Sequence, residues 1–212
     1  MSPAPPSRTR GPTGAAAPPP AWLSRRSLPL DILQAGTVLH RIHSASFGPL
    51  FFGPGLGSPP TYRFDSASSR FGVLYVGLSR AGAVAETLLR NPQRLMIATS
   101  EITGRTSTEL ACHRELRVVK LYGSGLQAVG TDNAISTGPY EPCGLWADAL
   151  WDHPDQPDGI AYQSRHDSNE ICLALFERPG VTFDIRSTKP LTAMSHEIAA
   201  FLDAHGKSLS PA

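Results

Sequence analysis

The pattern of apolar and polar positions along the chain predicts many short strands and a few amphipathic helices. Runs rich in apolar and β-branched residues predict strands at 37–42, 71–76, 95–99, 117–121, 159–163, 170–176 and 181–185. Helices are expected at 80–90, 142–151 and 191–204, the first with Ser79 as its N-cap. Because strands and helices do not alternate regularly, a doubly wound parallel sheet is disfavoured. We expect an α+β fold with a split, mixed or largely antiparallel sheet and flanking helices.

The first 29 residues differ in composition from the rest of the chain. They contain 8 of the 20 prolines, four arginines and no acidic residue. A Pro/Ala-rich segment without apolar periodicity buries too little apolar surface to offset the entropy lost on ordering. It also lacks the apolar stretch of a secretory signal. We therefore expect residues 1–29 to be a disordered N-terminal extension and residues 30–212 to form one domain.

Composition and charge exclude several classes of protein. The three cysteines, Cys112, Cys143 and Cys172, lack CxxC spacing, which disfavours a disulfide scaffold or zinc ribbon and favours a reducing, cytoplasmic location. No apolar run reaches the roughly 20 residues that a membrane span needs. Residues 30–212 hold 15 basic and 18 acidic residues, a net charge of −3. Neither a membrane nor nucleic acid is therefore an expected partner, and any phosphate site must be local.

A few polar residues stand in apolar strand or helix contexts and are candidates for chemistry. They are Arg41, Arg63, Tyr75, Glu86 and Ser164. Each also has an ordinary structural interpretation: the arginines could be surface residues, and Glu86 could pair with Arg90, one helical turn away. Tyr75 could be a core residue, and Ser164 could cap the turn that follows it. His40 and His43 lie three apart on an expected strand, so they point to opposite faces and do not suggest a shared metal.

The order of these residues and their local contexts resembles the RES-domain family. The similarity covers about residues 37–186. It runs through Leu39-His40-Arg41, Tyr62-Arg63-Phe64-Asp65, Val73-Leu74-Tyr75-Val76, Ala85-Glu86, Leu116–Leu121, the helix with Trp146, Asp158–Arg165 and Leu173–Phe176. Two features depart from the family pattern: Asp65 stands where asparagine is expected, and a long Gly/Pro loop at 48–60 precedes it.

The resemblance implies an enzyme that cleaves the nicotinamide–ribose bond of NAD. The family is similar to ADP-ribosyltransferases in fold, and its members are toxins of RES–Xre toxin–antitoxin pairs. NAD would then be a substrate, inorganic phosphate the co-substrate, and an Xre-type antitoxin the protein partner, with no cofactor or metal; an oligomer is compatible with this. Water or a protein side chain are alternative acceptors, the latter making the chain a protein ADP-ribosyltransferase. An inactive RES-like binding module is the alternative from another class.

The resemblance also assigns roles, and the residue types suit them. Cleavage of an N-glycosidic bond builds positive charge on the ribose, which the carboxylate of Glu86 would stabilise. Arg41 and Arg63 would hold the NAD diphosphate or the attacking phosphate through their planar forks. Tyr75 would stack on nicotinamide, and Ser164 would hydrogen-bond the ribose or orient the nucleophile.

Overall fold

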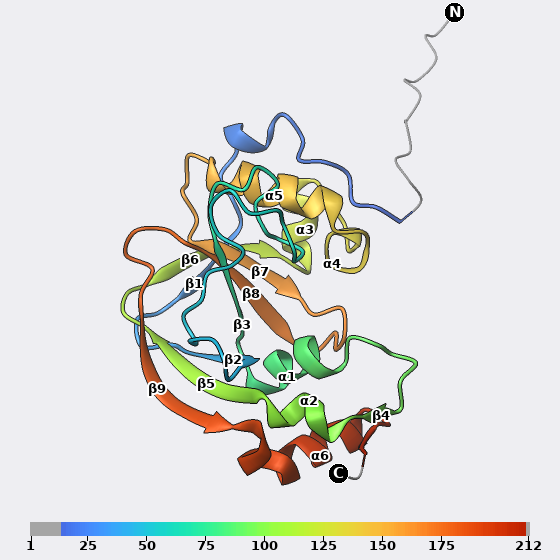
Figure 1. Ribbon diagram of the computed structural model, residues 1–212. Helices are drawn as coiled ribbons and strands as arrows, with labels where there is room; N and C mark the ends of the chain where they lie inside the picture. The colour runs from blue at the N-terminus through green and yellow to red at the C-terminus, as the bar shows by residue number, and fades with distance from the viewer. Residues whose placement is uncertain (1–13, 211–212) are drawn as a thin grey trace, which may run out of the picture.

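The fold is built around one mixed sheet with helices at both ends. The computed structural model describes residues 14–210 (Figure 1). In spatial order the eight strands are β1 (Leu30–Leu33), β6 (Leu116–Leu121), β7 (Gly159–Gln163), β8 (Ile171–Phe176), β3 (Val73–Gly77), β2 (Val38–Ser44), β5 (Arg105–Cys112) and β9 (Phe183–Pro190). Within this eight-stranded sheet only β6 and β7 pair in parallel; the other neighbours are antiparallel. The predicted α+β class and largely antiparallel sheet are confirmed.

The sheet is split between β2 and β3. These two strands share a single residue pair, His40 with Gly77, whereas β3 pairs with β8 over five residues and β2 with β5 over seven. Two half-sheets, β1-β6-β7-β8-β3 and β2-β5-β9, therefore diverge from this point. The divergence leaves space beside His40 and Gly77 that continuous pairing would close.

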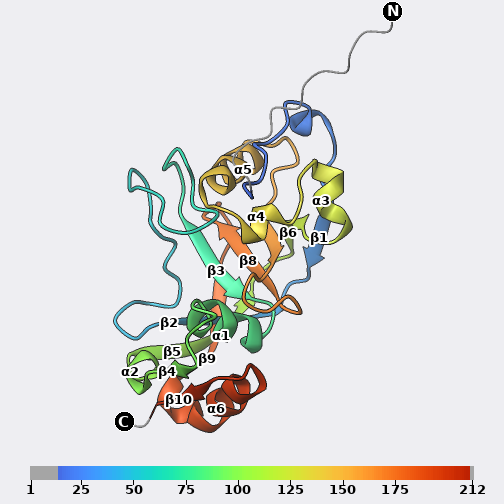
Figure 2. The same cartoon turned by 90° about the vertical axis from the view of Figure 1, so that its right-hand side faces the viewer.

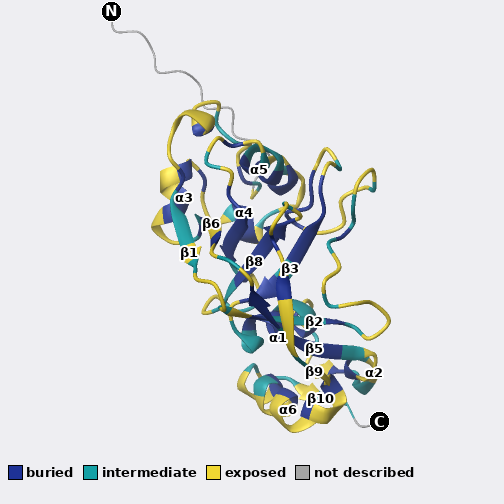
Figure 3. Cartoon of the chain, turned by 90° about the vertical axis from the view of Figure 1, so that its left-hand side faces the viewer, coloured by how far each residue is buried: buried dark blue, intermediate teal, exposed yellow. Residues whose placement is uncertain are grey.

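Each half-sheet has its own set of helices. Near β6, β7 and β8 lie α3 (Ser124–Val129), α4 (Ala134–Thr137) and α5 (Glu141–Trp151); near β5 and β9 lie α2 (Thr99–Thr103) and α6 (Ser195–Ala204), as Figures 1 and 2 both show. The 3-10 turn Leu191–Met194 leads into α6, and the short parallel pair β4 (Met96–Ile97) and β10 (Ser208–Leu209) packs beside it. The central strands are the most buried part of the molecule (Figure 3). Trp146 of α5 and Phe176 of β8 anchor the core of the first half, and Ile198 and Leu202 of α6 that of the second.

Helix α1 (Arg80–Leu88) follows β3 directly and lies at the split. Ser79 is its N-cap, as predicted: its Oγ accepts a hydrogen bond from the N–H of Gly82. The turn into the helix requires glycine at position 77, because a Cβ there would lie 2.5 Å from the carbonyl oxygen of Ser79. The helix buries the face that carries Val84 and Leu88, which leaves Glu86 only partly buried on another face.

The N-terminal segment corrects one expectation. Residues 14–29, which belong to the predicted extension, pack on the domain: Leu23 is buried in the 3-10 turn Leu23–Arg25, and the carbonyl of Ala17 accepts a 2.8 Å hydrogen bond from the Trp146 indole. Scattered apolar residues here join the core that surrounds α5, which composition alone does not reveal. Residues 1–13 lie outside the described part of the chain.

Candidate active site

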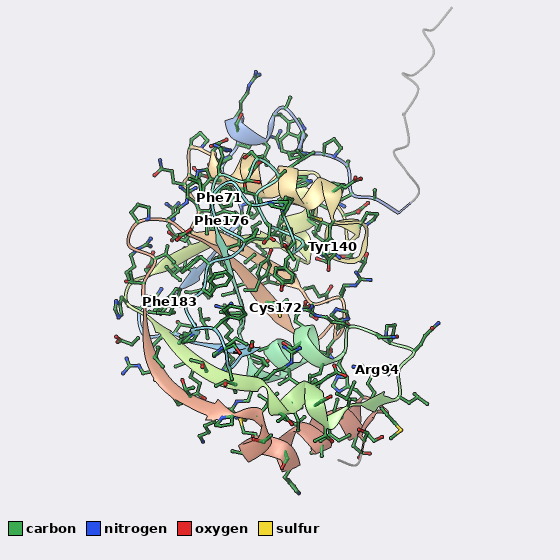
Figure 4. All side chains as sticks on the ribbon, in the orientation of Figure 1. Phe71, Arg94, Tyr140, Cys172, Phe176 and Phe183 are labelled. Carbon is green, nitrogen blue, oxygen red and sulfur yellow. The ribbon has the colours of Figure 1, made fainter. Side chains whose placement is uncertain are left out.

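A cavity of about 270 Å³ opens at the split in the sheet. Its wall comes from β2, the loop before β3, β3 itself, α1, α4, the segment before α5, the end of β7 with the turn after it, and the start of β8. Residues with polar or aromatic side chains in this wall are His40, Arg41, Tyr62, Arg63, Tyr75, Glu86, Thr87, Arg90, Ser136, Tyr140, Tyr162, Arg165, His166 and Cys172, of which Tyr140 and Cys172 are labelled in Figure 4. Four of the five predicted site residues line the cavity directly.

The fifth, Ser164, reaches the site through Glu86. Its hydroxyl donates a 2.6 Å hydrogen bond to Oε1 of Glu86, which lies 78 residues away in the sequence. Ser164 is only 3% exposed, and its Oγ also accepts a 3.1 Å hydrogen bond from the N–H of His166. With a further 3.4 Å hydrogen bond from the N–H of Asp167, three contacts fix the hydroxyl, and the hydroxyl in turn fixes one carboxylate oxygen at the cavity wall.

The alternative role for Glu86, an ion pair with Arg90, does not occur. Nε of Arg90 donates a 2.8 Å hydrogen bond to the main-chain carbonyl of Glu86, not to its carboxylate. Among the described residues, the Glu86 carboxylate forms no ion pair within 4.0 Å. Its negative charge therefore remains available to a ligand in the cavity.

Arg63 is buried with part of its donor capacity unused. Its Nη1 donates to the carbonyls of Ile135 at 3.2 Å and Gly138 at 2.9 Å, and its guanidinium lies 4.5 Å from the ring centroid of Tyr140. Its Nη2 is buried and has no hydrogen-bond partner among residues 14–210. A buried donor left unpaired is costly, so this nitrogen is well suited to an anionic ligand oxygen.

Arg41 connects the cavity to the Gly/Pro loop. Its Nη1 donates to the carbonyls of Pro49 at 2.6 Å and Phe51 at 3.1 Å. Burial lowers the pKa of Arg41 to about 10, so the guanidinium stays charged at neutral pH. The side chain thus holds the loop while presenting positive charge to the cavity.

The hydroxyl of Tyr75 is fixed by two hydrogen bonds, one that it donates and one that it accepts. The hydroxyl donates to Oδ1 of Asp65 and accepts from the N–H of Phe64, both at 2.9 Å. Oδ2 of Asp65 accepts from the N–H groups of Thr61 and Tyr62, at 2.8 and 2.6 Å. Burial raises the pKa of Tyr75 well above its usual range, and burial also raises the pKa of Asp65. Asp65, which stands where the family pattern has asparagine, therefore accepts hydrogen bonds from three donors: the Tyr75 hydroxyl and the N–H groups of Thr61 and Tyr62.

Several wall residues escaped the sequence analysis. Tyr62 packs edge-on against Tyr75 with 5.5 Å between ring centroids, and Tyr140 covers Arg63. Tyr162 is buried, which together with the charge of Glu86 raises its pKa well above the usual range. For Tyr162 a sequence signal existed, because it stands in the motif that ends at Ser164. Tyr140 follows a Gly-Pro pair and carried no such signal.

The pKa of His166 is lowered, whereas that of Tyr162 is raised. Burial lowers its pKa, the charge of Glu86 raises it, and the positive charges of Arg165, Arg90 and Arg63 lower it further. The imidazole is therefore neutral at pH 7. Arg63, Arg90 and Arg165 line the same cavity as this ring, although residues 30–212 are acidic overall.

Two further features bear on the class of site. Residues 14–210 contain no group of three or more His, Cys, Asp or Glu side chains placed to hold a metal ion. In the same part of the chain, no helix has both the length and the apolar character to cross a membrane.

Comparison with known proteins agrees with this fold and motif set. Residues 38–195 match the family model of the RES domain, so the chain belongs to the RES domain family. It is 30% identical over 109 residues to a protein of Sinorhizobium fredii (strain NBRC 101917 / NGR234) named "Probable toxin y4kH", covering 50% of this chain and 84% of that protein. It also shares its fold with a chain in the crystal structure of the M. tuberculosis MbcT–MbcA toxin–antitoxin complex. That match has a TM-score of 0.61 and 17% identity over 80% of this chain and 92% of the other.

Proposed function

We propose that this RES domain cleaves the nicotinamide–ribose bond of NAD and transfers the ADP-ribosyl group to inorganic phosphate. The observation that carries the proposal is the Glu86 carboxylate, which has no ion pair in the described chain and is fixed by buried Ser164 in a cavity with arginine and tyrosine walls. A carboxylate held in this way is what a reaction that builds positive charge on a sugar requires.

In the proposed reaction the bond between the ribose anomeric carbon and the nicotinamide nitrogen breaks. The bonding electrons go to the nitrogen, which neutralises the pyridinium, so nicotinamide leaves without needing a proton. The positive charge that develops on the ribose lies beside Glu86, whose carboxylate stabilises it. A phosphate oxygen then bonds to the anomeric carbon and gives ADP-ribose 1″-phosphate.

The arginines and tyrosines supply binding in this scheme. The free Nη2 of Arg63 donates to a phosphate oxygen, and Arg41 adds charge from the loop side. The rings of Tyr75, Tyr62 and Tyr140 offer aromatic faces or edges to nicotinamide. Ser164 acts by orienting Glu86 and not as a covalent nucleophile, because its hydroxyl donates to a carboxylate and not to a histidine base.

We further propose that the chain is the toxin of a toxin–antitoxin pair. Support comes from family membership, from the relative named as a probable toxin, and from the fold shared with a chain of a toxin–antitoxin complex. The partner would be an antitoxin protein of the Xre type that restrains NAD cleavage in the cell.

Incubating the pure protein with NAD, with and without phosphate, tests the proposal and separates its rivals. Nicotinamide together with ADP-ribose 1″-phosphate is the expected product pair. Nicotinamide with free ADP-ribose would indicate water as acceptor, and labelled protein would indicate ADP-ribosyl transfer to side chains. Absence of turnover under all conditions would leave a binding module and contradict the proposal.

A further inference from the structure

A second cavity, of about 310 Å³, adjoins the first. It lies between the end of α1, the turn after β7 and the segment that leads from α6 to β10. Its lining residues are Leu89, Arg90, Pro92, Leu95, Arg165, His166, His205, Gly206 and Lys207. Arg90, Arg165 and His166 line both cavities, so the two hollows meet at a basic boundary.

The charged side chains that line the second cavity are all basic. No acidic residue is among its described lining, and within residues 14–210 neither Arg90 nor Arg165 forms an ion pair. Nζ of Lys207 is held by the carbonyls of Asn91, Pro92 and Arg94 at 3.3, 3.1 and 2.5 Å, so its charge is fixed without being neutralised. Cations gathered without counter-charges favour an anionic ligand.

Besides Glu86, which lines the first cavity and forms no ion pair with either arginine, one acidic side chain stands close to the boundary and is already engaged. Oδ2 of Asp167 lies 3.1 Å from Nε2 of His205, and Oδ1 accepts a hydrogen bond from the N–H of Asn169. Asp167 therefore compensates His205 and not the two arginines. The boundary between the cavities keeps its positive charge.

The remaining wall of the second cavity is apolar. Leu89, Pro92 and Leu95 form it, and Leu95 is 67% exposed to solvent. An apolar surface beside clustered cations suits a ligand that has a flat, weakly polar ring next to a phosphate. A nucleotide has this combination.

We propose that the second cavity binds the adenylate half of NAD and that Arg90 and Arg165 hold the diphosphate between the two cavities. The inference rests on the proposed function, which supplies the identity of the ligand. A dinucleotide consists of two nucleosides joined by an anionic diphosphate, and the protein has two cavities that share a boundary lined by Arg90 and Arg165. With the reacting ribose beside Glu86 in the first cavity, the diphosphate passes the shared boundary and adenosine packs on the wall that includes Leu95. Arg63 then remains free for the attacking phosphate.

Binding of AMP tests the subsite without any turnover. AMP carries the adenine, ribose and phosphate of this half and lacks nicotinamide. Calorimetric titration should show AMP binding to the parent protein, weakened about tenfold or more by Arg165→Gln, which removes a charged donor. Leu95→Asp should weaken it similarly, because it places a negative charge on a wall of the second cavity only; the exposed position makes it tolerable for folding.

Two matched variants control for general effects of charge. Arg186→Gln removes an exposed arginine of β9, and Leu145→Asp adds a carboxylate on an exposed position of α5; neither residue lines a cavity described above. Both should bind AMP as the parent does. The inference would be overturned if AMP failed to bind the parent, or if Arg165→Gln and Leu95→Asp bound AMP as tightly as the parent does.

A comparison of two substrates provides a second test of the subsite. Nicotinamide mononucleotide contains the reacting bond but lacks the adenylate half. The parent should therefore prefer NAD, and Arg165→Gln and Leu95→Asp should each reduce the ratio of kcat/KM for NAD to that for the mononucleotide at least tenfold. An unchanged ratio would overturn the inference even with NAD turnover intact. AMP binding that depends on Arg165, without cleavage of either substrate, would instead contradict the proposed function and leave the nucleotide subsite standing.

Discussion

At the scale of single residues, the site depends on a carboxylate and a hydroxyl brought together from distant parts of the chain. Glu86 stands on α1 and Ser164 just after β7, and one 2.6 Å hydrogen bond joins them. The hydroxyl donates to the carboxylate and accepts from the main chain, so it has a single useful orientation. In this arrangement Ser164 serves by positioning Glu86.

This dependence predicts a strong coupling between the two residues. Ser164→Ala should lower kcat for NAD about tenfold, since the carboxylate loses its fixed orientation. In a Glu86→Gln background the same change should have little further effect, because the charge that Ser164 orients is already gone. Turnover of the two single variants and the double variant forms a double-mutant cycle. Additive losses in that cycle would mean that Ser164 acts on the substrate independently of Glu86.

Arg63 combines a structural and a binding role, which makes lysine a poor replacement. Its guanidinium serves two carbonyls and a tyrosine ring while one nitrogen stays free. Arg63→Lys should lower the free energy of unfolding by about 1–3 kcal/mol and raise KM for NAD or phosphate about tenfold. Urea denaturation and steady-state kinetics check both effects, with exposed Arg186→Lys as the control. Parent-like KM values in Arg63→Lys would remove this residue from the binding site.

At the scale of elements, apolar patterning predicted the strands whose side chains alternate or are continuously apolar. The predicted bounds lie close to the observed ones for helix α1 and for four strands, which span 73–77, 116–121, 159–163 and 171–176. Strand β5 was missed because its sequence, RTSTELAC, has polar residues where apolar ones are expected. Thr108 is fully buried there, and its hydroxyl is satisfied by His43 at 2.9 Å and Thr188 at 3.2 Å. Polar side chains satisfied by other strands leave no signal in local patterning.

The N-terminal segment gives a test at the same scale. Leu23 is 4% exposed in a segment that composition assigned to a disordered extension. Leu23→Ala should lower the free energy of unfolding by about 2–4 kcal/mol, because it leaves a cavity beside the core around α5. Leu56→Ala, at a position that is 81% exposed, should change it by less than about 0.5 kcal/mol. Equal unfolding midpoints for the two variants in urea would show that the segment does not pack in solution.

At the scale of the whole molecule, the split between two half-sheets produces the site. Continuous pairing of β2 with β3 would bring the strands together where the cavity now opens. The sequence indicated Arg41, Arg63, Tyr75, Glu86 and Ser164 only together, because their order and local contexts resemble the RES-domain family. It did not indicate that Arg90 and Arg165 line both cavities, because the two residues come together only when the fold brings the end of α1 beside the turn after β7. Long-range juxtaposition of this kind has no local sequence signature.

The proposed activity has a consequence for a cell that makes this protein without a partner. Expression should lower the cellular NAD concentration before growth stops, because consumption of a shared co-substrate precedes its effects on metabolism. Expression of Glu86→Gln at the same level should leave NAD and growth close to those of uninduced cells. Timed extraction and assay of NAD alongside culture density measures both. Growth arrest at normal NAD concentration would indicate a different target.

In the proposed reaction the Glu86 carboxylate promotes NAD cleavage, and one substitution isolates its charge. Glu86→Gln keeps the side-chain length and an amide oxygen that accepts the hydrogen bond from Ser164, so the melting temperature should change little. NAD turnover by the pure variant should fall about 100-fold or more, the scale for losing one fixed electrostatic group. The exposed Glu115→Gln serves as the matched control and should keep parent turnover. NAD cleavage by Glu86→Gln at the parent rate would show that the charge of Glu86 takes no part in the reaction.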